Sequence, residues 1–345
     1  MASGMDDRTT RVLRHIVEDY IATAEPVGSR TISKKMGQSL SPATIRNIMA
    51  DLEEAGFLAQ PHTSAGRVPT GAGFRYYIDH LLARQSLARG EMDQLHRAAG
   101  EGNGPADELV RQVSRLLSNL ARQASVVVVS SPEQQVLSSV SLMRAGVERI
   151  LLVTVMRGGW VQHRLIEGEP DLTGDELERF SAYLNELAEG RTLLQLRARI
   201  LDELGKEKAR YDRVMGRALA MSARALTDTA PGEVFIEGRA NILEQPEFAE
   251  DVHRLKRILR AFEEKSVIFR LLDRAMVSRA IQVSVGLENT VEELPDISVV
   301  ASGYRQGASS VGSIGLIGPV RMDYSRVIPL VEYAASLLTT MFEDR

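Results

Sequence analysis

Strand-forming segments in this chain fall into two groups, and a helix-rich stretch separates them. Residues 191–226 form that stretch and are rich in Ala, Leu and Arg, which favour helices as a set. Four apolar segments with many β-branched residues precede it: 126–129, 136–142, 149–156 and 160–166. Four more follow it: 234–236, 280–285, 297–304 and 311–317. Strands interrupted by helices in this way predict an α+β fold with a helix-rich insertion.

Local signals predict further helices and turns. Thr173 and Glu176 have the spacing of a capping box, and apolar residues continue at helical spacing until Gly190. The same spacing predicts three more helices, over residues 107–123, 246–265 and 325–341. Residues 157–159 contain two glycines and predict a hairpin turn. Residues 98–106 are rich in Gly and predict a linker.

Composition limits the classes of protein to consider. A chain of 345 residues corresponds to two or three domains at roughly 150 residues each. The 44% hydrophobic and 26% charged residues exclude a wholly disordered or fibrous protein. The absence of Cys excludes disulfides, thiolate metal sites and a Cys nucleophile, and fits a reducing compartment. No apolar run approaches the roughly 20 residues that span a bilayer, and no export signal is evident, so we expect a cytoplasmic protein without membrane contact.

Motifs for catalysis are not found in the sequence. The six His residues are scattered, and none forms a close metal-ligand pair. Neither a nucleophile elbow nor a phosphate-binding loop is present. Residues 312–318 have GxxGxxG spacing without Lys, which is typical of a glycine-bearing strand that ends in a turn. We therefore expect neither an enzyme nor a cofactor.

Residues 1–90 have a different character. They predict helices over 9–23, 30–36 and 72–84, a helix from Pro42 to about Gly56, a short strand at 57–60 and a turn-rich loop at 61–69. Ser29 is expected to cap the second helix, and Gly37 to end it in the left-handed conformation. Ser41 is a preferred N-cap, and Pro42 suits the first helical position. This order is typical of a winged helix-turn-helix, whose second helix enters the major groove of DNA by its amino-terminal end.

The candidate DNA contacts follow from that geometry. On the recognition helix they are Ser41, Thr44, Arg46 and Asn47, and on the wing they are His62, Thr63, Ser64 and Arg67. Asn can pair with adenine, and Arg with guanine or phosphate. Residues 1–90 hold eleven Lys/Arg and nine Asp/Glu, a net charge of +2 that permits DNA binding without requiring it. Two alternatives stay open: a helical unit that only packs, and an Arg46 that pairs with Asp51 or Glu53 on its own helix.

Several long motifs resemble the heat-inducible transcription repressor family HrcA. In the first part of the chain they lie at residues 25–30, 41–47, 51–54, 60–67, 69–70 and 73–77. In the second part they lie at Gly238 and Asn241 and at residues 245–248, 286–289 and 317–324. Ile48 departs from the pattern, because many relatives have Glu there; we expect it on the inward face. Residues 145–225 resemble the family mainly in pattern, and none of the motifs named above lies within them.

The resemblance implies a division into domains. It implies a winged helix-turn-helix over residues 1–90, a linker over 91–106, and a GAF-like domain split between 107–144 and 226–345. Residues 145–225 would be an inserted dimerising domain, which agrees with the helix-rich interruption between the strand groups. DNA contact is carried onto Thr44, Arg46 and Asn47, and also onto the other candidates named above.

The resemblance also implies a function. The family binds an inverted-repeat operator, the CIRCE element, as a homodimer and represses chaperone operons, and its activity depends on the GroE chaperonin. No catalytic residue, metal or cofactor is implied. The alternative function is a ligand-sensing winged-helix regulator whose GAF-like domain binds a small metabolite. An enzyme with an accessory DNA-binding head is a further alternative, but it would need a catalytic constellation that the sequence lacks.

Overall fold

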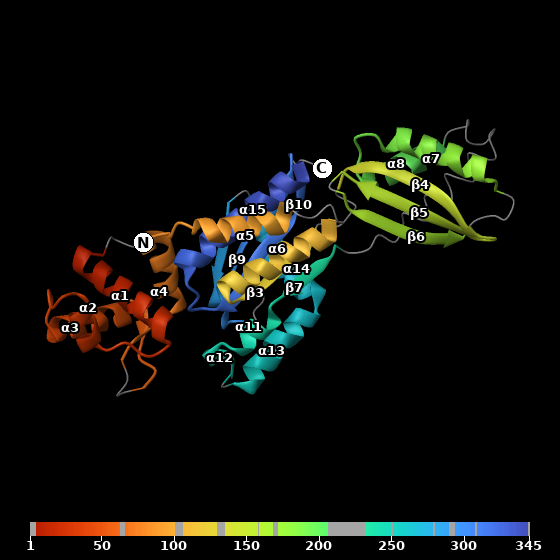
Figure 1. Cartoon of the computed structure of the whole chain (residues 1–345). Helices are drawn as coiled ribbons and strands as arrows, with labels where there is room; N and C mark the ends of the chain where they lie inside the picture. The colour runs from red at the N-terminus through yellow and green to blue at the C-terminus, as the bar shows by residue number, and fades with distance from the viewer. Residues whose placement is uncertain are drawn as a thin grey trace.

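The computed structural model describes residues 5–62, 66–100, 106–129, 135–157, 159–167, 172–205, 232–249, 251–278, 280–289, 294–307 and 309–343. Figure 1 shows three parts in a row along an elongated molecule. We call them the head (residues 5–81), the split domain (the sheet with the helices on its two faces) and the inserted unit (residues 137–205). The mixture of helices and strands confirms the α+β class.

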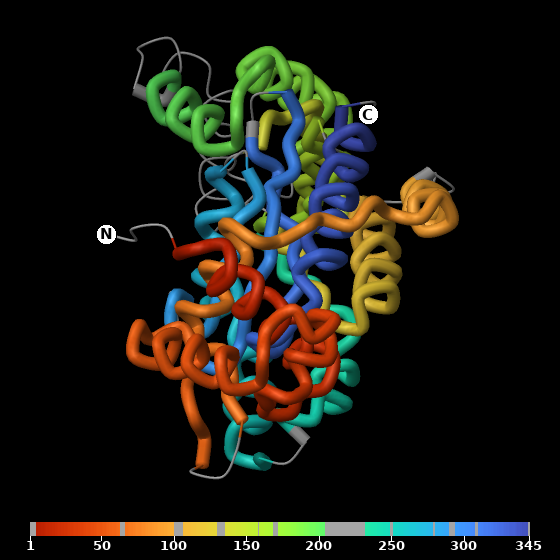
Figure 2. Tube along the Cα trace, turned by 90° about the vertical axis from the view of Figure 1, so that its left-hand side faces the viewer, coloured from red at the N-terminus to blue at the C-terminus, as the bar shows by residue number. Residues whose placement is uncertain are grey.

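The head contains the elements expected of residues 1–90. Its helices are α1 (Asp7–Thr23), α2 (Ser29–Lys35), α3 (Pro42–Glu54) and α4 (Gly71–Tyr76), and α4 continues as a π-helix over Tyr77–Leu81. Strands β1 (Leu58–Ala59) and β2 (Val68–Pro69) form an antiparallel hairpin after α3. Gly37 is left-handed, as predicted, with φ of 62°. The prediction that Ser29 caps α2 was wrong, because Gly28 holds the N-cap position and Ser29 is the first helical residue. Figure 2 looks onto the head, drawn in red and orange.

The linker predicted over residues 91–106 is mostly a packed helix. Helix α5 spans Arg89–Gly100, and Leu95 and Ala99 are buried on one of its faces. That face packs against α6 (Ala106–Ala121) and α15 (Tyr324–Glu343). The segment predicted as a linker therefore includes a packed helix as far as Gly100, and residues 101–105, within its Gly-rich part, lie outside the described residues.

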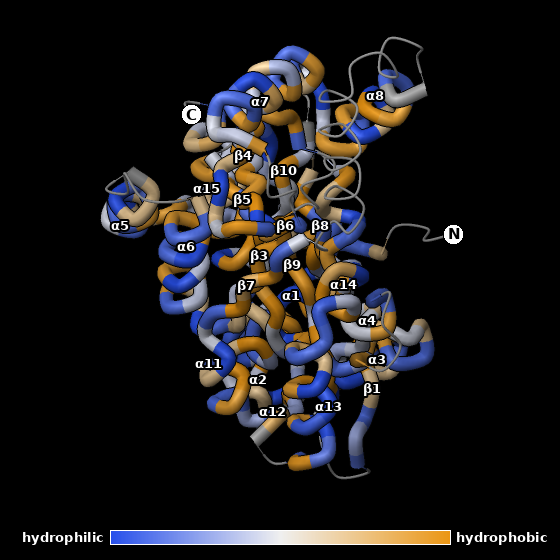
Figure 3. Tube along the Cα trace, turned by 90° about the vertical axis from the view of Figure 1, so that its right-hand side faces the viewer, coloured by the Kyte–Doolittle hydropathy of each residue, from blue (hydrophilic) through white to orange (hydrophobic). Residues whose placement is uncertain are grey.

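The split domain is built on one antiparallel sheet with the strand order β7-β3-β10-β9-β8. The strands are β3 (Ala124–Val129), β7 (Val234–Glu237), β8 (Gln282–Val285), β9 (Ile297–Gln306) and β10 (Ser309–Pro319). Val127 and Val129 of β3 face α6 and α15, whereas Val126 and Val128 face α14 and its neighbours. Because helices cover both faces, β3 is buried along its whole length and β9 over its first six residues. Figure 3 shows these strands in the interior of the split domain.

The single helix predicted over residues 246–265 is broken in the structure. Helix α11 (Arg239–Leu243) precedes α12 (Pro246–Ala249), and α13 (Val252–Glu263) starts a new axis. Asp251 causes the break, because its carboxylate accepts hydrogen bonds from the backbone N–H groups of His253 and Arg254 at 2.9 and 3.0 Å. A further helix, α14 (Lys265–Val277), covers the sheet and was not predicted.

The inserted unit has its own sheet and core. Strands β4 (Leu137–Gly146), β5 (Arg149–Met156) and β6 (Val161–Glu167) form a three-stranded antiparallel sheet. Helices α7 (Gly174–Ala188) and α8 (Leu193–Gly205) complete the unit, and the capping box of Thr173 and Glu176 is formed. The border placed at residue 145 cuts through β4, which pairs with β5 from Leu137 onward. Most of the helix-rich stretch after residue 205 lies outside the described residues.

The candidate nucleic-acid interface

Helix α3 is held in place by its cap and by its inward face. The Ser41 hydroxyl accepts a hydrogen bond from the Thr44 backbone N–H at 3.1 Å, and Pro42 occupies the first helical position. Ile45, Met49 and Leu52 are buried against the rest of the head. Ile48 packs partly into the same core, as expected for the inward face. The opposite face of α3 is thereby presented to solvent.

Four of the candidate residues lie together at the amino-terminal end of α3. Ser41, Thr44, Arg46 and Asn47 are all exposed. The hydroxyls of Ser41 and Thr44 lie 2.9 Å apart. Arg46 makes no ion pair with any residue that the structure describes, so its pairing with Asp51 or Glu53 is not seen. A guanidinium and a carboxamide next to a capped helix end can read base edges and hold a phosphate.

The base of the β1–β2 hairpin is fastened to two other segments of the head. Arg67 and Val27 exchange two backbone hydrogen bonds of 2.9 Å. Arg67 Nε also lies 2.8 Å from Glu53 Oε2, and the Arg67 side chain is only 20% exposed. Gly66 allows this close approach, because a Cβ there would lie 2.4 Å from the Val27 carbonyl oxygen. Arg67 is therefore held at the base of the hairpin by both its backbone and its side chain.

The other wing candidates are less defined. His62 is exposed just beyond β1, whereas Thr63 and Ser64 lie outside the described residues. The sequence reasoning overlooked Arg30 and Lys34, two exposed cations four residues apart on α2. Because the first helix of a helix-turn-helix crosses the DNA backbone, their i, i+4 spacing could have identified them as phosphate contacts.

Two polar residues, Tyr77 and Asp19, are buried in the core of the head. Burial raises the pKa of Tyr77 to about 12, so its hydroxyl stays protonated at neutral pH. Asp19 is buried and forms an ion pair with Lys35, which joins α1 to the end of α2. These contacts stabilise the helical arrangement that exposes α3.

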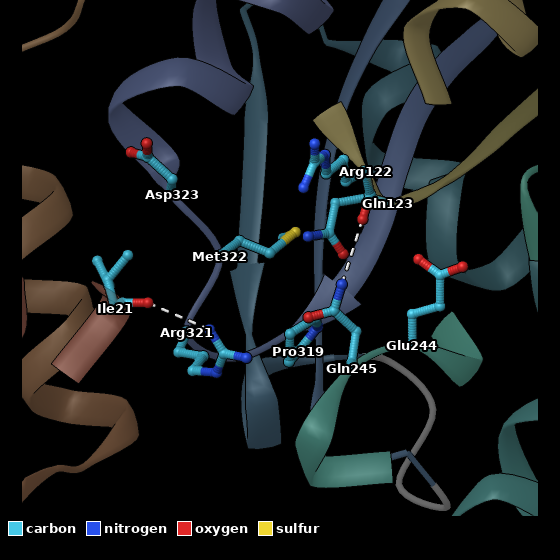
Figure 4. A pocket seen from close by; sticks show the side chains of 9 residues that line it. All are labelled: Ile21, Arg122, Gln123, Glu244, Gln245, Pro319, Arg321, Met322 and Asp323. Atoms are coloured by element: carbon cyan, nitrogen blue, oxygen red, sulfur yellow. Dashed lines mark hydrogen bonds between the residues drawn. The ribbon is translucent and has the colours of Figure 1, made fainter. Parts of the chain in front are cut away.

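A small polar pocket lies where the head meets the split domain. Its volume is about 320 Å³, near the lower end of ligand-site sizes. Figure 4 shows its lining, which includes Ile21 of α1, Gln123, Gln245 and Arg321. Among the described residues, no group of His, Asp and Glu has the arrangement of a metal site. None of the described helices is long and apolar enough to cross a membrane.

Comparisons with known proteins agree with this architecture. Residues 107–328 match the family model described as HrcA protein C terminal domain. The chain is 44% identical over 344 residues to the heat-inducible transcription repressor HrcA of Syntrophobacter fumaroxidans, covering 99% of both chains. It is 42% identical to the protein of the same name from Geobacter sulfurreducens, covering 98% of both. A solved structure, titled a crystal structure of a hypothetical protein, shares the fold with a TM-score of 0.67 at 22% identity and 99% coverage of both chains.

Proposed function

Because this chain belongs to the HrcA family of heat-inducible transcription repressors, we propose that it represses chaperone operons by binding the inverted-repeat CIRCE operator as a homodimer in the cytoplasm. The family is one of transcription repressors and not of enzymes. The observation that carries the proposal is the capped amino-terminal end of α3, where Thr44, Arg46 and Asn47 are all exposed to solvent.

Reading an operator requires contacts of two kinds, and the head offers residues for both. Arg46 and Asn47 have the donors and acceptors for base edges in the major groove. Ser41 and the free N–H groups of the α3 terminus suit a phosphate, as do Arg30 and Lys34 on α2. We assign His62, Thr63 and Ser64 to the wing contact, and Arg67 to holding the wing.

An inverted repeat is read by a two-fold dimer, and the inserted unit offers a surface for it. On the sheet face turned away from α7 and α8, Met143 is 48% exposed, Val161 58% and Leu165 56%. Met143, Leu151 and Leu165 lie side by side on β4, β5 and β6. A row of exposed apolar side chains across a sheet supports association with a second copy of the same face.

Dependence on the GroE chaperonin is supported by the path of the chain. Val127 of β3 pairs with Ile314 of β10, and the inserted unit lies between them in sequence. Pairing between such distant segments is slow and leaves apolar strands exposed during folding. The rate at which a repressor with this topology folds into its active form would therefore depend on the amount of free chaperonin.

The test is fluorescence anisotropy on two duplexes, one with the full inverted repeat and one with a half scrambled. Both are titrated at two salt concentrations, because phosphate contacts make affinity depend on salt. We expect tight binding to the full repeat and a large loss on the scrambled duplex. Equal, weak binding to both, persisting after refolding with chaperonin and ATP, would refute the proposal.

A further inference from the structure

One arginine of the split domain reaches into the head. Arg321 lies in the turn between β10 and α15, and its Nη1 donates a hydrogen bond to the Ile21 carbonyl of α1 at 3.1 Å. The other side of the guanidinium pairs with Glu247 of α12, with Nη2 to Oε2 at 3.2 Å and a second contact from Nε to Oε1. The Arg321 side chain is 15% exposed. One planar group thus joins three segments that are far apart in sequence. Figure 4 shows its contact with the Ile21 carbonyl.

The Ile21 carbonyl needs a donor from outside its own helix. It lies in the last turn of α1, where carbonyls lack partners within the helix. The backbone N–H of Glu25, which would normally bond it, donates instead to the Thr23 hydroxyl at 3.2 Å. The last turn of α1 also contains no basic residue. Arg321 therefore supplies both the hydrogen bond and the positive charge that favour a helix carboxyl terminus.

A second arginine also ties the head to the split domain. Arg75 of α4 donates to the Val283 carbonyl at 2.6 Å and to Glu288 Oε1 at 2.9 Å. The rings of Phe74 in the head and Tyr324 in the split domain lie 6.2 Å apart. Directional hydrogen bonds from two arginines, together with an aromatic pair across the same junction, restrict the angle of the head as well as its position.

We infer that Arg321 is a positioning residue for operator recognition: it sets the angle at which each head is held, and so the spacing of half-sites that a dimer reads. This inference rests on the proposed function. Two heads on one dimer bind with high avidity only when their geometry allows both to engage at once. A head that is no longer held at a fixed angle keeps its own contacts with DNA. The dimer then loses the gain in affinity that comes from binding both half-sites at once.

The experiment compares Arg321→Ala, Arg321→Lys and Glu247→Gln with the unaltered full-length protein. Arg115→Ala is the matched control, because it removes an arginine paired with Glu237 inside the split domain, away from the head. Affinity is measured on the full repeat, on a single half-site and on repeats whose spacer is lengthened or shortened by one base pair. Thermal melting identifies any variant that fails to fold.

For Arg321→Ala we expect about a tenfold or greater loss on the full repeat, little change on the half-site and a broader tolerance of spacer length. Glu247→Gln and Arg321→Lys should fall between this variant and the control. Equal losses on half-site and full repeat, or an unchanged spacer preference in a folded variant, would overturn the inference. If the unaltered protein itself fails to prefer the full repeat, the proposed function fails instead.

Discussion

Arg67 Nε lies 2.8 Å from Glu53 Oε2, which joins the base of the β1–β2 hairpin to the last turn of α3. The pair connects the hairpin that we propose as the wing to the helix that we propose reads the bases. The orientation of the β1–β2 hairpin relative to α3 therefore depends on this contact between Arg67 and Glu53.

The first prediction separates two roles for Arg67. If the arginine clamps the wing, Glu53→Ala, which leaves Arg67 in place, should weaken operator binding about as much as Arg67→Ala. If Arg67 contacts phosphate, only Arg67→Ala should weaken binding, and the dependence of log affinity on log salt should fall by about one unit. Anisotropy titrations at several salt concentrations distinguish the two, and we expect the first result.

The second prediction concerns Arg46. Because its side chain is exposed and pairs with no described residue, Arg46→Ala should leave thermal stability nearly unchanged. It should reduce operator affinity by about 1–3 kcal/mol if the guanidinium reads a guanine. Arg239→Ala is the control, since it removes an exposed arginine from the split domain. An equal loss on random DNA would reassign Arg46 to the phosphate backbone.

The third prediction tests the open sheet face of the inserted unit. Leu165→Glu places a charge at the β6 end of the exposed apolar row and should convert dimers to monomers in light scattering. Operator affinity should fall with it, while half-site affinity is retained. Leu201→Glu is matched in chemistry and in exposure, at 52%, but lies on α8, on the other side of the unit. A dimeric Leu165→Glu variant would show that the interface lies elsewhere.

The fourth prediction compares two glycines of α4. A Cβ on Gly73 would lie 2.2 Å from the Phe57 carbonyl oxygen, whereas one on Gly71 meets nothing within 4 Å. Gly73→Ala should therefore lower the free energy of unfolding by about 1–3 kcal/mol, as overpacking does. Gly71→Ala should be neutral or slightly stabilising. Urea unfolding measures both, and equal stabilities would contradict the close packing of α4 against the backbone of Phe57.

The fifth prediction is a pH dependence at the junction. Burial raises the pKa of Glu288, but the Arg75 guanidinium and the Val285 N–H outweigh it and hold that pKa below 4.5. The folded protein then binds fewer protons than the unfolded chain, so this stabilisation is present above pH 4.5 and is lost as the pH falls below it. Between about pH 6 and about pH 3.5, the melting temperature of Glu288→Gln should fall less than that of the unaltered protein. Glu332→Gln, which breaks the Arg84 pair, is the control.

Local signals predicted the elements whose boundaries depend on neighbouring residues. The cap of Ser41 and the Thr173–Glu176 box formed as expected, because each involves atoms within one helical turn. Strand β5 has the predicted bounds, since alternating burial marks both its ends. The exposed set of Ser41, Thr44, Arg46 and Asn47 follows directly from which face of α3 is apolar.

Other elements were not predicted correctly, because two sequence signals of similar strength favoured different structures. The domain division implied by the resemblance had a linker from residue 91, but Leu95 and Ala99 are buried and the helix α5 continues as far as Gly100. Periodicity favoured one helix through residue 251, but the Asp251 side chain captured the backbone N–H groups that would have continued it. The border inside β4 was missed because strand periodicity does not reveal which sheet a strand joins.

The sequence by itself therefore determined the fold class and the exposed face of α3, because apolar periodicity and caps act over a few residues, while its long motifs identified the family. Only the tertiary structure decided that Arg67 pairs with Glu53 and that Arg321 reaches the Ile21 carbonyl. Those contacts join residues whose proximity arises from the path of the whole chain. An arginine has the same chemistry wherever it lies in the sequence, and its partner is set by what folding brings within reach.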